Sequence, residues 1–338
     1  MTPRVVEATA PTRVDLAGGT LDIWPLYLFH RGAVTVNVAI DRRAWCRVET
    51  GVTGVRVESR DTRQEAEGRD VSEVLAGGKL TLAAFVLRAL GIETGVRVVL
   101  QSQVPAGSGL GGSSALAVAV AAAASRAAGR PLGGEALVAL VRDAEAQSIG
   151  VPTGVQDYWA ALLGGVLAVA LDPGGPRGER LATDPGRVEA SLLLVDAGAT
   201  RFSGINNWEV FKRRIDGDAS VTKALGDIAA VALRVRDALQ DRRYEEVAGL
   251  MGEEWEARKR LAPAVTTPEI DRIVEAARSV GGGAKVCGAG GGGMVAVWAP
   301  GGAGGAGTRE AAVKALDAAG FRATPVRTDL RGLEVNEL

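Results

Sequence analysis

A glycine-rich segment with two adjacent hydroxyls is the first candidate for chemistry in this sequence. Residues 104–115 read Val-Pro-Ala-Gly-Ser-Gly-Leu-Gly-Gly-Ser-Ser-Ala, between an expected strand over 96–100 and an apolar helix expected over 113–128. Glycine lets the main chain approach an anion, and the free N–H groups and dipole of a helix N-terminus attract negative charge. The segment is neither a Walker A sequence nor a dinucleotide-binding motif. It fits a phosphate-binding loop, and equally a capped helix with Ser113 or Ser114 as N-cap.

The elements that position this segment alternate between strand and helix. Alternation and β-branched residues predict strands over 34–40, 45–49, 55–59, 96–100, 166–171, 191–196, 294–299 and 324–328. Apolar periodicity predicts helices over 82–90, 113–128, 134–149, 155–163, about 207–261, 268–280 and 309–319. The Gly/Pro/Arg-rich stretch between the strands 166–171 and 191–196 is a candidate lobe boundary, and 301–307 is expected to be a flexible loop.

Composition limits the class of protein. The 338 residues can bury either one large core or two lobes that share a cleft, and two lobes is the better interpretation. A sequence with 47% hydrophobic residues, no long apolar run and no signal-peptide pattern predicts a soluble, cytoplasmic protein. The balance of 39 basic against 40 acidic residues, without a basic stripe, argues against nucleic acid as a partner. Cys46 and Cys287 suggest neither a disulfide framework nor a zinc site.

Three ordered motifs resemble those of the GHMP kinases. Residues 104–115 are similar to the family's Pro-x-x-x-Gly-Leu-Gly-Ser-Ser-Ala, residues 10–22 (Ala-Pro-Thr-Arg-Val-Asp-Leu-Ala-Gly-Gly-Thr-Leu-Asp) to its first motif, and residues 285–293 (Lys-Val-Cys-Gly-Ala-Gly-Gly-Gly-Gly) to its third. The resemblance implies an α+β fold of two lobes, a ribosomal protein S5 domain 2-like N-terminal lobe and a ferredoxin-like C-terminal lobe. We place these ATP-binding and C-terminal lobes at 1–185 and 186–338.

The resemblance also implies the cofactors, ATP and Mg²⁺, and the residues that hold them. The second motif has one glycine more than the family pattern, Gly112, and we assign the metal to Ser114, with Ser113 as its neighbour, and to Glu145. The residues expected to bind the nucleotide are Pro105, Gly107, Ser108, Gly109, Leu110, Gly111, Gly112, Ser113 and Ser114.

Two carboxylates and one arginine form the expected catalytic group. Glu145 precedes Asp157 by 12 positions, close to the family spacing between a metal-binding Glu and a catalytic Asp. Mg²⁺ takes one or two carboxylates plus phosphate oxygens, and a carboxylate aimed at a hydroxyl can accept its proton, so Asp157 is the expected base. Arg13 matches a basic residue of the family's sugar kinases and would stabilise the transferring phosphoryl group. Without the resemblance, ordinary surface or capping acids, and a structural pair of Arg13 with Asp15 or another acid, are the alternatives.

The first motif favours a sugar as the phosphoryl acceptor. Its Ala-Gly-Gly pattern is closer to heptose-phosphate and fucose kinases than to galactokinase, and residues 154–165 resemble the heptose-kinase branch. We therefore expect a heptose 7-phosphate, with Asp22 accepting hydrogen bonds from its hydroxyls. Arg201, or the run Lys212 to Arg214, would meet its phosphate, although the run also suits a solvated helix face. The residues expected to bind the substrate are Gly18, Gly19, Thr20, Asp22, Gly154, Gln156, Arg201, Gly290 and Gly291.

Other functions stay open at this point. Fucose, galactose or a mevalonate derivative are alternative acceptors, including in an enzyme that phosphorylates before it decarboxylates. A sensor of the same fold that binds ATP and sugar without turnover is an alternative of a different class. The glycines at 288–293 fit either a loop that closes on the site or a tight turn that needs positive φ. No membrane partner is expected, and the sequence leaves a homodimer open.

Overall fold

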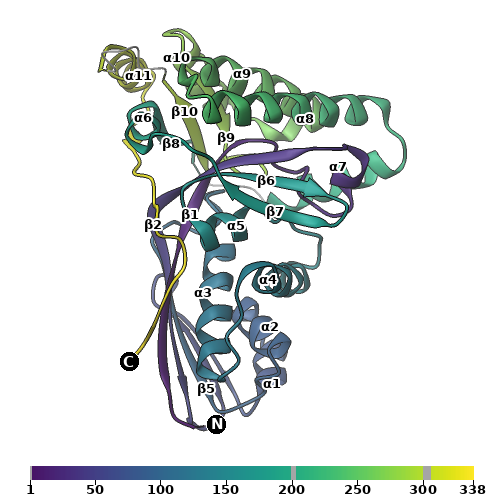
Figure 1. The fold of residues 1–338 in the computed structure, drawn as a ribbon, viewed down its shortest axis with the longest axis vertical. Helices are drawn as coiled ribbons and strands as arrows, with labels where there is room; N and C mark the ends of the chain where they lie inside the picture. Colours follow the sequence, from purple (N-terminus) through teal and green to yellow (C-terminus); the bar gives the residue numbers. More distant parts are fainter. Residues whose placement is uncertain (1, 199–202, 300–305) are drawn as a thin grey trace.

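The computed structural model describes residues 2–198, 203–299 and 306–338, and its elements form two sheets with helices packed on them (Figure 1). The larger sheet has the order β12-β1-β2-β5-β3-β4, and the hairpin β6–β7 joins it through β2. Its strands are β1 (Val5–Ala17), β2 (Val34–Thr50), β3 (Val55–Ser59), β4 (Gln64–Gly68), β5 (Val96–Ser102), β6 (Val166–Asp172), β7 (Gly175–Arg180) and β12 (Glu334–Glu337). The helices between them are η1 (Leu26–Phe29), α1 (Val71–Ala76), α2 (Thr81–Ala89), α3 (Gly112–Ala127), α4 (Gly134–Ile149) and α5 (Gln156–Leu163).

The smaller sheet has four antiparallel strands in the order β11-β8-β10-β9. In chain order these strands follow a β-α-β-β-α-β pattern, which is that of a ferredoxin-like fold. Its strands are β8 (Leu192–Asp196), β9 (Gly283–Val286), β10 (Met294–Trp298) and β11 (Ala323–Pro325). The helices of this half are α6 (Pro185–Ser191), α7 (Ser203–Ile215), α8 (Ala219–Gln240), α9 (Tyr244–Leu261), η2 (Pro263–Val265), α10 (Pro268–Arg278) and α11 (Ala306–Ala318).

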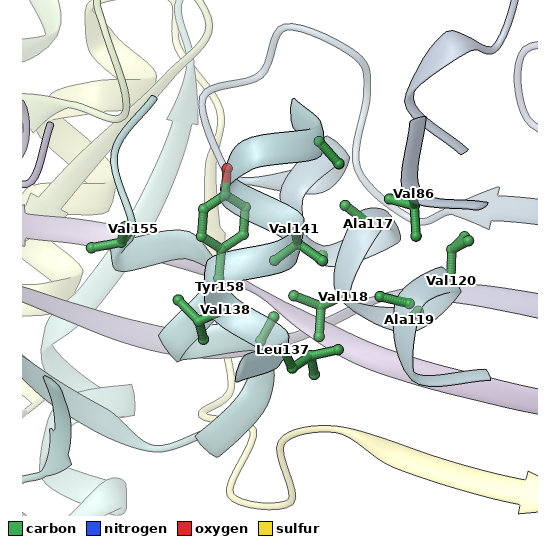
Figure 2. Packing of buried hydrophobic residues seen from close by; sticks show 14 of the residues in the cluster. Val86, Ala117, Val118, Ala119, Val120, Leu137, Val138, Val141, Val155 and Tyr158 are labelled. Carbon is green, nitrogen blue, oxygen red and sulfur yellow. The ribbon is translucent and has the colours of Figure 1, made fainter. Parts of the chain in front are cut away.

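The helix that follows the glycine-rich loop is buried on all sides. Helix α3 is rich in Ala and Val, lies on β1 and β2, and is covered by α2, α4 and α5. Figure 2 shows its Ala117–Val120 segment facing Val86 of α2 and Leu137 of α4, with the ring of Tyr158 beside Val141. Small side chains let these helices approach closely, and removing their apolar surface from water stabilises the arrangement. This packing fixes the N-terminus of α3 relative to α4 and α5.

Most expected elements are confirmed, and the mixed α and β fold class is confirmed with them. The expected strands 34–40 and 45–49 form one strand, β2, because β1 pairs with β2 along nearly the whole length of β2. The expected strand 324–328 is shorter, because β11 ends at Pro325, which has no N–H to donate. The expected loop at 301–307 lies largely outside the described residues.

The Gly/Pro/Arg-rich stretch between 171 and 191, interpreted as a loop and a candidate lobe boundary, contains a strand and a helix. Gly175–Arg180 forms β7, an antiparallel partner of β6. Pro185 then opens α6, where the carboxylate of Asp184 accepts a hydrogen bond from the N–H of Gly186. Strand β7 forms through its pairing with β6, despite the glycines and charges in its sequence. Helix α6 forms because Pro185 suits its first position and Asp184 caps its N-terminus.

The two cysteines, Cys46 and Cys287, are both free and buried. Burial raises the pKa of Cys46 to about 12 and that of Cys287 to about 11, so both thiols stay protonated at neutral pH.

Within the described ranges, no helix combines the length and the apolar character that crossing a bilayer requires.

Candidate active site

All three motifs contribute to one cavity of about 1240 Å³. The first motif lines it with Arg13 and the turn around Gly19, the second with the glycine-rich loop, and the third with Gly288 and Ala289. Helix α4 adds Glu145, and the start of α5 adds Asp157. Motifs that lie far apart in the sequence therefore meet around a space large enough for more than one small molecule.

The glycine-rich loop leads directly into the N-terminus of α3. Gly111 is the N-cap, at φ +74°, and no side chain caps the helix, so the prediction that Ser113 or Ser114 could be the N-cap was wrong. Gly109 lies at φ +76° so close to the carbonyl of Cys287 that a Cβ would overlap it. The carbonyl of Ser108 accepts a hydrogen bond of 3.0 Å from the N–H of Met294. The loop is thus held by the third motif, and the N–H groups of the first turn are left for an anion.

Both serines of the second motif bond to the same carboxylate. The hydroxyl of Ser113 donates to Glu145 Oε1 at 2.7 Å, and that of Ser114 donates to Oε2 at 2.8 Å. The phenol of Tyr158 donates to Oε2 at 2.6 Å. Burial raises the pKa of Glu145, although these three hydroxyls oppose the shift. A carboxylate with two hydroxyls provides the hard oxygen donors that Mg²⁺ prefers, so these residues fit that ion.

Asp157 is oriented by Arg13 in the same cavity. Arg13 Nε and Nη2 lie 2.7 and 2.6 Å from Asp157 Oδ1, and Arg13 Nη1 donates to the carbonyl of Gly109. The other carboxylate oxygen, Oδ2, is 3.4 Å from the hydroxyl of Ser114. Burial disfavours the charge of Arg13, but the carboxylates of Asp157 and Asp15 outweigh it and raise the pKa of Arg13. Of the alternative that Arg13 forms a structural pair with Asp15 or another acid, the part that names Asp15 was wrong, because Asp15 pairs with Lys285 and Arg13 pairs with Asp157.

A further part of the cavity lining comes from the later residues of the first motif and from the segment that leads into α5. Asp22 Oδ2 accepts hydrogen bonds from the N–H groups of Val155 at 2.7 Å and of Gln156 at 2.9 Å. Gly154 lies so close to Asp22 that a side chain there would overlap the carboxylate. Burial raises the pKa of Asp22 to about 6, partly opposed by the two N–H groups and reinforced by the charge of Asp157. Asp22 is therefore partly protonated near neutral pH.

Two buried oxygens on this side have no hydrogen-bond partner. They are Asp15 Oδ1 and Gln156 Oε1, and both residues line the cavity. An unpaired buried acceptor costs free energy unless a ligand or water donates to it. These oxygens therefore add to the acceptor character of this side of the cavity.

Most of the residues predicted for the site line the cavity. Leu110, Gly18, Gly290 and Gly291 are not among its lining residues, and Arg201 lies outside the described residues. Leu110 belongs to the core, where its carbonyl accepts a hydrogen bond from the N–H of Arg13. The lining includes Arg13, Gly19, Thr20, Asp22, Pro105, Gly107, Ser108, Gly109, Gly111, Gly112, Ser113, Ser114, Glu145, Gly154, Gln156 and Asp157.

The run Lys212 to Arg214 does not reach the cavity, and only Lys212 of the three is exposed. Lys212 pairs with Glu209 on the same helix, and Arg213 pairs with Asp218. Arg214 stacks its guanidinium over the ring of Phe29, 4.5 Å from the centroid. None of the three is a cavity-lining residue.

Several residues of the site were not predicted. Asn207 and Trp208 of α7 line the cavity, and Asn207 accepts a hydrogen bond from Thr20. Tyr158 reaches Glu145 from the position after Asp157, which the spacing of residues on α4 and α5 could not reveal. Asp15 lies in the first motif and Lys285 in the third. The one sequence signal that they are buried was that each has apolar residues on both sides.

Comparison with known proteins agrees with this arrangement. The family model "GHMP kinases N terminal domain" matches residues 79–165, and "GHMP kinases C terminal" matches residues 235–320, together about half of the chain. The D-glycero-alpha-D-manno-heptose 7-phosphate kinase of Campylobacter jejuni is 27% identical over 86% of this chain and 88% of its own length. The mevalonate kinase of Aeropyrum pernix is 28% identical over the same shares of the two chains.

A solved structure supports the fold over the whole length. The crystal structure of a D-glycero-D-manno-heptose 1-phosphate kinase from Bacteroides thetaiotaomicron superimposes with a TM-score of 0.76, covering 98% of this chain and 99% of that one. Its sequence identity of 23% makes this a likeness of fold. Together with the two family models and the three motifs around one cavity, it leads to one conclusion: the chain belongs to the GHMP kinases.

Proposed function

We propose that this protein transfers the γ-phosphoryl group of ATP to a hydroxyl of a sugar or sugar phosphate. One observation carries the proposal: the carboxylate of Asp157, held by Arg13, lies between a glycine-rich helix N-terminus and a side of the cavity rich in hydrogen-bond acceptors. Phosphoryl transfer depends mainly on positioning and on stabilising charge, and this arrangement offers both.

The glycine-rich loop 107–114 is the proposed site of the ATP phosphates. The loop would bind these anionic groups through its main-chain N–H groups and through the dipole of α3. Glu145 and Ser114, with Ser113 beside them, would hold Mg²⁺, which supplies neutralisation of the charge on the phosphate oxygens when bound. Among the described residues there is no group of three or more His, Cys, Asp or Glu that would cage a metal without the nucleotide. This suits an ion that arrives with ATP.

Asp157 is the proposed general base. Its Oδ1 is occupied by Arg13, which leaves Oδ2 to orient the acceptor hydroxyl and take its proton. The hydroxyl oxygen then forms the new bond to the γ-phosphorus, and the bond from that phosphorus to the β,γ-bridging oxygen breaks. The fixed positive charge of Arg13 stabilises the charge that develops on the transferred group.

The acceptor side favours a polyol over a carboxylic acid. Asp15, Asp22 and Asp157 present carboxylates there, and Gln156 presents an unpaired carbonyl oxygen. Such groups accept hydrogen bonds from hydroxyls, whereas a carboxylate such as that of mevalonate has no hydrogen to donate to them. A sugar is therefore preferred to a mevalonate derivative as the acceptor. Fucose and galactose belong to the same class and stay alternatives to a heptose.

A heptose 7-phosphate is the proposed acceptor within this class. The name of the Campylobacter jejuni relative and the first-motif pattern support it. Within the described part of the chain, Arg13 is the one basic residue that lines the cavity, and its guanidinium is bound to Asp157 and to the carbonyl of Gly109. A phosphate on the acceptor would need another cation, for which we propose Arg201.

The deciding experiment measures ADP formation from ATP and Mg²⁺ with free hexoses, heptoses, their phosphates and mevalonate. We expect turnover with a sugar or sugar phosphate and a fall of about 10²–10⁴ in kcat for Asp157→Asn, the usual range for a general base. Asp143→Asn is the matched control, because Asp143 is an exposed acid on α4 that pairs with Arg142.

Three outcomes would count against parts of this proposal. Normal turnover of Asp157→Asn would exclude Asp157 as the base. Binding of ATP and a sugar without ADP formation would indicate a sensor. Turnover of mevalonate alone would overturn the choice of a sugar.

We also propose that the two lobes divide between residues 185 and 186. In support, β7 of the larger sheet ends at Arg180 and β8 of the smaller sheet begins at Leu192, and the proposed division falls after the first residue of α6, which lies between them. The chain returns across this division at its end, where β12 pairs with β1.

A further inference from the structure

Four buried charged side chains form a continuous ion chain beside the cavity. We name the residues Asp15, Lys285, Glu254 and Arg258 the interior ion chain; each is at most 2% exposed. Lys285 Nζ lies 2.9 Å from Asp15 Oδ2 and 3.1 Å from Glu254 Oε1. Arg258 Nη2 lies 2.6 Å from the same Glu254 oxygen. The charges alternate in sign, so each is compensated by a neighbour.

The interior ion chain joins the two sheets. Asp15 lies on β1, Lys285 on β9, and Glu254 and Arg258 one turn apart on α9. Burial alone would raise the pKa of Glu254, but the charges of Arg258 and Lys285 lower it to about 2. Replacing such a chain by apolar residues would often be neutral or stabilising, so ion pairs of this kind are weak evidence for stability as their purpose.

The far end of the chain reaches the acceptor side of the cavity. Arg258 Nη2 donates to the carbonyl of Gly19 at 3.0 Å, and Nη1 donates to the hydroxyl of Thr20 at 3.3 Å. Gly19 and Thr20 both line the cavity. At the other end of the chain, Asp15 packs under the same turn, because a Cβ on Gly19 would lie 2.5 Å from Asp15 Oδ2.

The turn that Arg258 contacts has a strained main chain. Thr20 has φ +77°, a region that is uncommon for non-glycine residues and unfavourable for a β-branched one. Strain of this kind persists only where surrounding contacts impose it, and it often marks a functional site. The hydroxyl of Thr20 accepts a hydrogen bond from Arg258 and donates one to Asn207 Oδ1 at 3.3 Å. Side chains from α9 and α7 therefore hold the strained residue.

We propose that Arg258 is a positioning residue for the phosphoryl acceptor, which holds the Gly19–Thr20 turn in the conformation that faces the cavity. The inference rests on the proposed function, since it takes this side of the cavity as the acceptor side. Arg258 acts through the turn and does not itself line the cavity. Glu254 and Lys285 hold its guanidinium in place from behind.

The test replaces Arg258 by lysine. Arg258→Lys keeps a positive charge beside Glu254, but its one nitrogen cannot take the places of both Nη1, which bonds Thr20, and Nη2, which bonds the Gly19 carbonyl and Glu254. We expect the KM for the sugar to rise about tenfold, the usual loss for one good hydrogen bond to a charged group. The KM for ATP should change less than twofold, because the glycine-rich loop has no contact with Arg258.

Arg43 supplies a matched control. It also bridges distant segments: it pairs with Asp329 and Glu334, donates to the carbonyl of Gly332 at 2.7 Å, and its side chain is 11% exposed. Neither Arg43 nor these partners line the cavity. Arg43→Lys should lower Tm and leave both KM values unchanged.

The outcomes separate the inference from the function on which it rests. If wild-type protein forms no ADP with any sugar, the proposed function fails, and the inference fails with it. If wild-type protein is active and Arg258→Lys lowers Tm like Arg43→Lys without changing the KM for the sugar, Arg258 is merely structural. An equal rise in both KM values would likewise overturn a role specific to the acceptor.

Discussion

Two buried glutamates in this protein have opposite electrostatic surroundings. Glu254 is compensated by Arg258 and Lys285, and its pKa falls to about 2. Glu145 faces the cavity with three hydroxyls and no cation within salt-bridge distance among the described residues, and burial raises its pKa. The charges of the interior ion chain are thus compensated within the protein, whereas Glu145 in the cavity has no cation beside it in the described part of the chain. Such uncompensated groups are typical of functional sites.

The same substitution at both glutamates gives the largest expected contrast in stability. Glu254→Gln removes the charge between two buried cations, and breaking a buried pair in this way costs about 3–5 kcal/mol of unfolding free energy. Glu145→Gln removes a charge that burial already disfavours, so its cost should be within about 1 kcal/mol. Urea unfolding of both variants, with the slope compared to wild type, measures the difference. Equal costs would show that the two glutamates are equivalent.

A second contrast comes from the pH dependence of Asp22. Its folded pKa of about 6 lies above the ordinary 3.8, so its protonated form stabilises the folded protein below about pH 4, and this contribution is lost as pH rises through 6. Raising a pKa from 3.8 to about 6 corresponds to about 3 kcal/mol at full ionisation. Asp22→Asn keeps an oxygen for the N–H groups of Val155 and Gln156 and cannot ionise.

Unfolding of wild type and Asp22→Asn between pH 4 and 8 tests this sign. The variant should gain up to about 3 kcal/mol relative to wild type as pH rises, with most of the change between pH 4 and 7. A constant difference between the two proteins across this range would show that Asp22 has an ordinary pKa.

Local sequence signals predicted the cavity better than the interior. The glycine-rich loop could be found because its chemistry is local in sequence, and Glu145 and Asp157 were found through the family resemblance of their spacing. Glu254 and Arg258 are separated from Asp15 by more than two hundred positions, and no motif marks them. Their pairing exists because α9 packs beside β9 and β1, which is a property of the tertiary fold.

The fold shows the same division between local and distant information. Helices such as α3 and α4 were predicted closely, because apolar periodicity and glycine breaks specify them locally. Strand β7 was missed, since its charged and glycine-rich sequence becomes a strand through its partner β6. Thr20 could not be predicted to have positive φ either, because contacts from α9 and α7 impose that conformation.

The smallest expected effect on stability tests the contact between the glycine-rich loop and the third motif, at Gly109. Gly109→Ala puts a Cβ against the carbonyl of Cys287 at φ +76°, which should cost about 1–2 kcal/mol and displace the glycine-rich loop. Gly91→Ala is the matched control, because Gly91 has φ +68° with nothing within 4 Å of a Cβ. Thermal unfolding should show the backbone cost alone, about 1 kcal/mol, in Gly91→Ala and a larger loss in Gly109→Ala, where the overlap with the Cys287 carbonyl adds to it. The KM for ATP should rise at least tenfold in Gly109→Ala alone; an unchanged value would mean that contact with the third motif does not shape the nucleotide site.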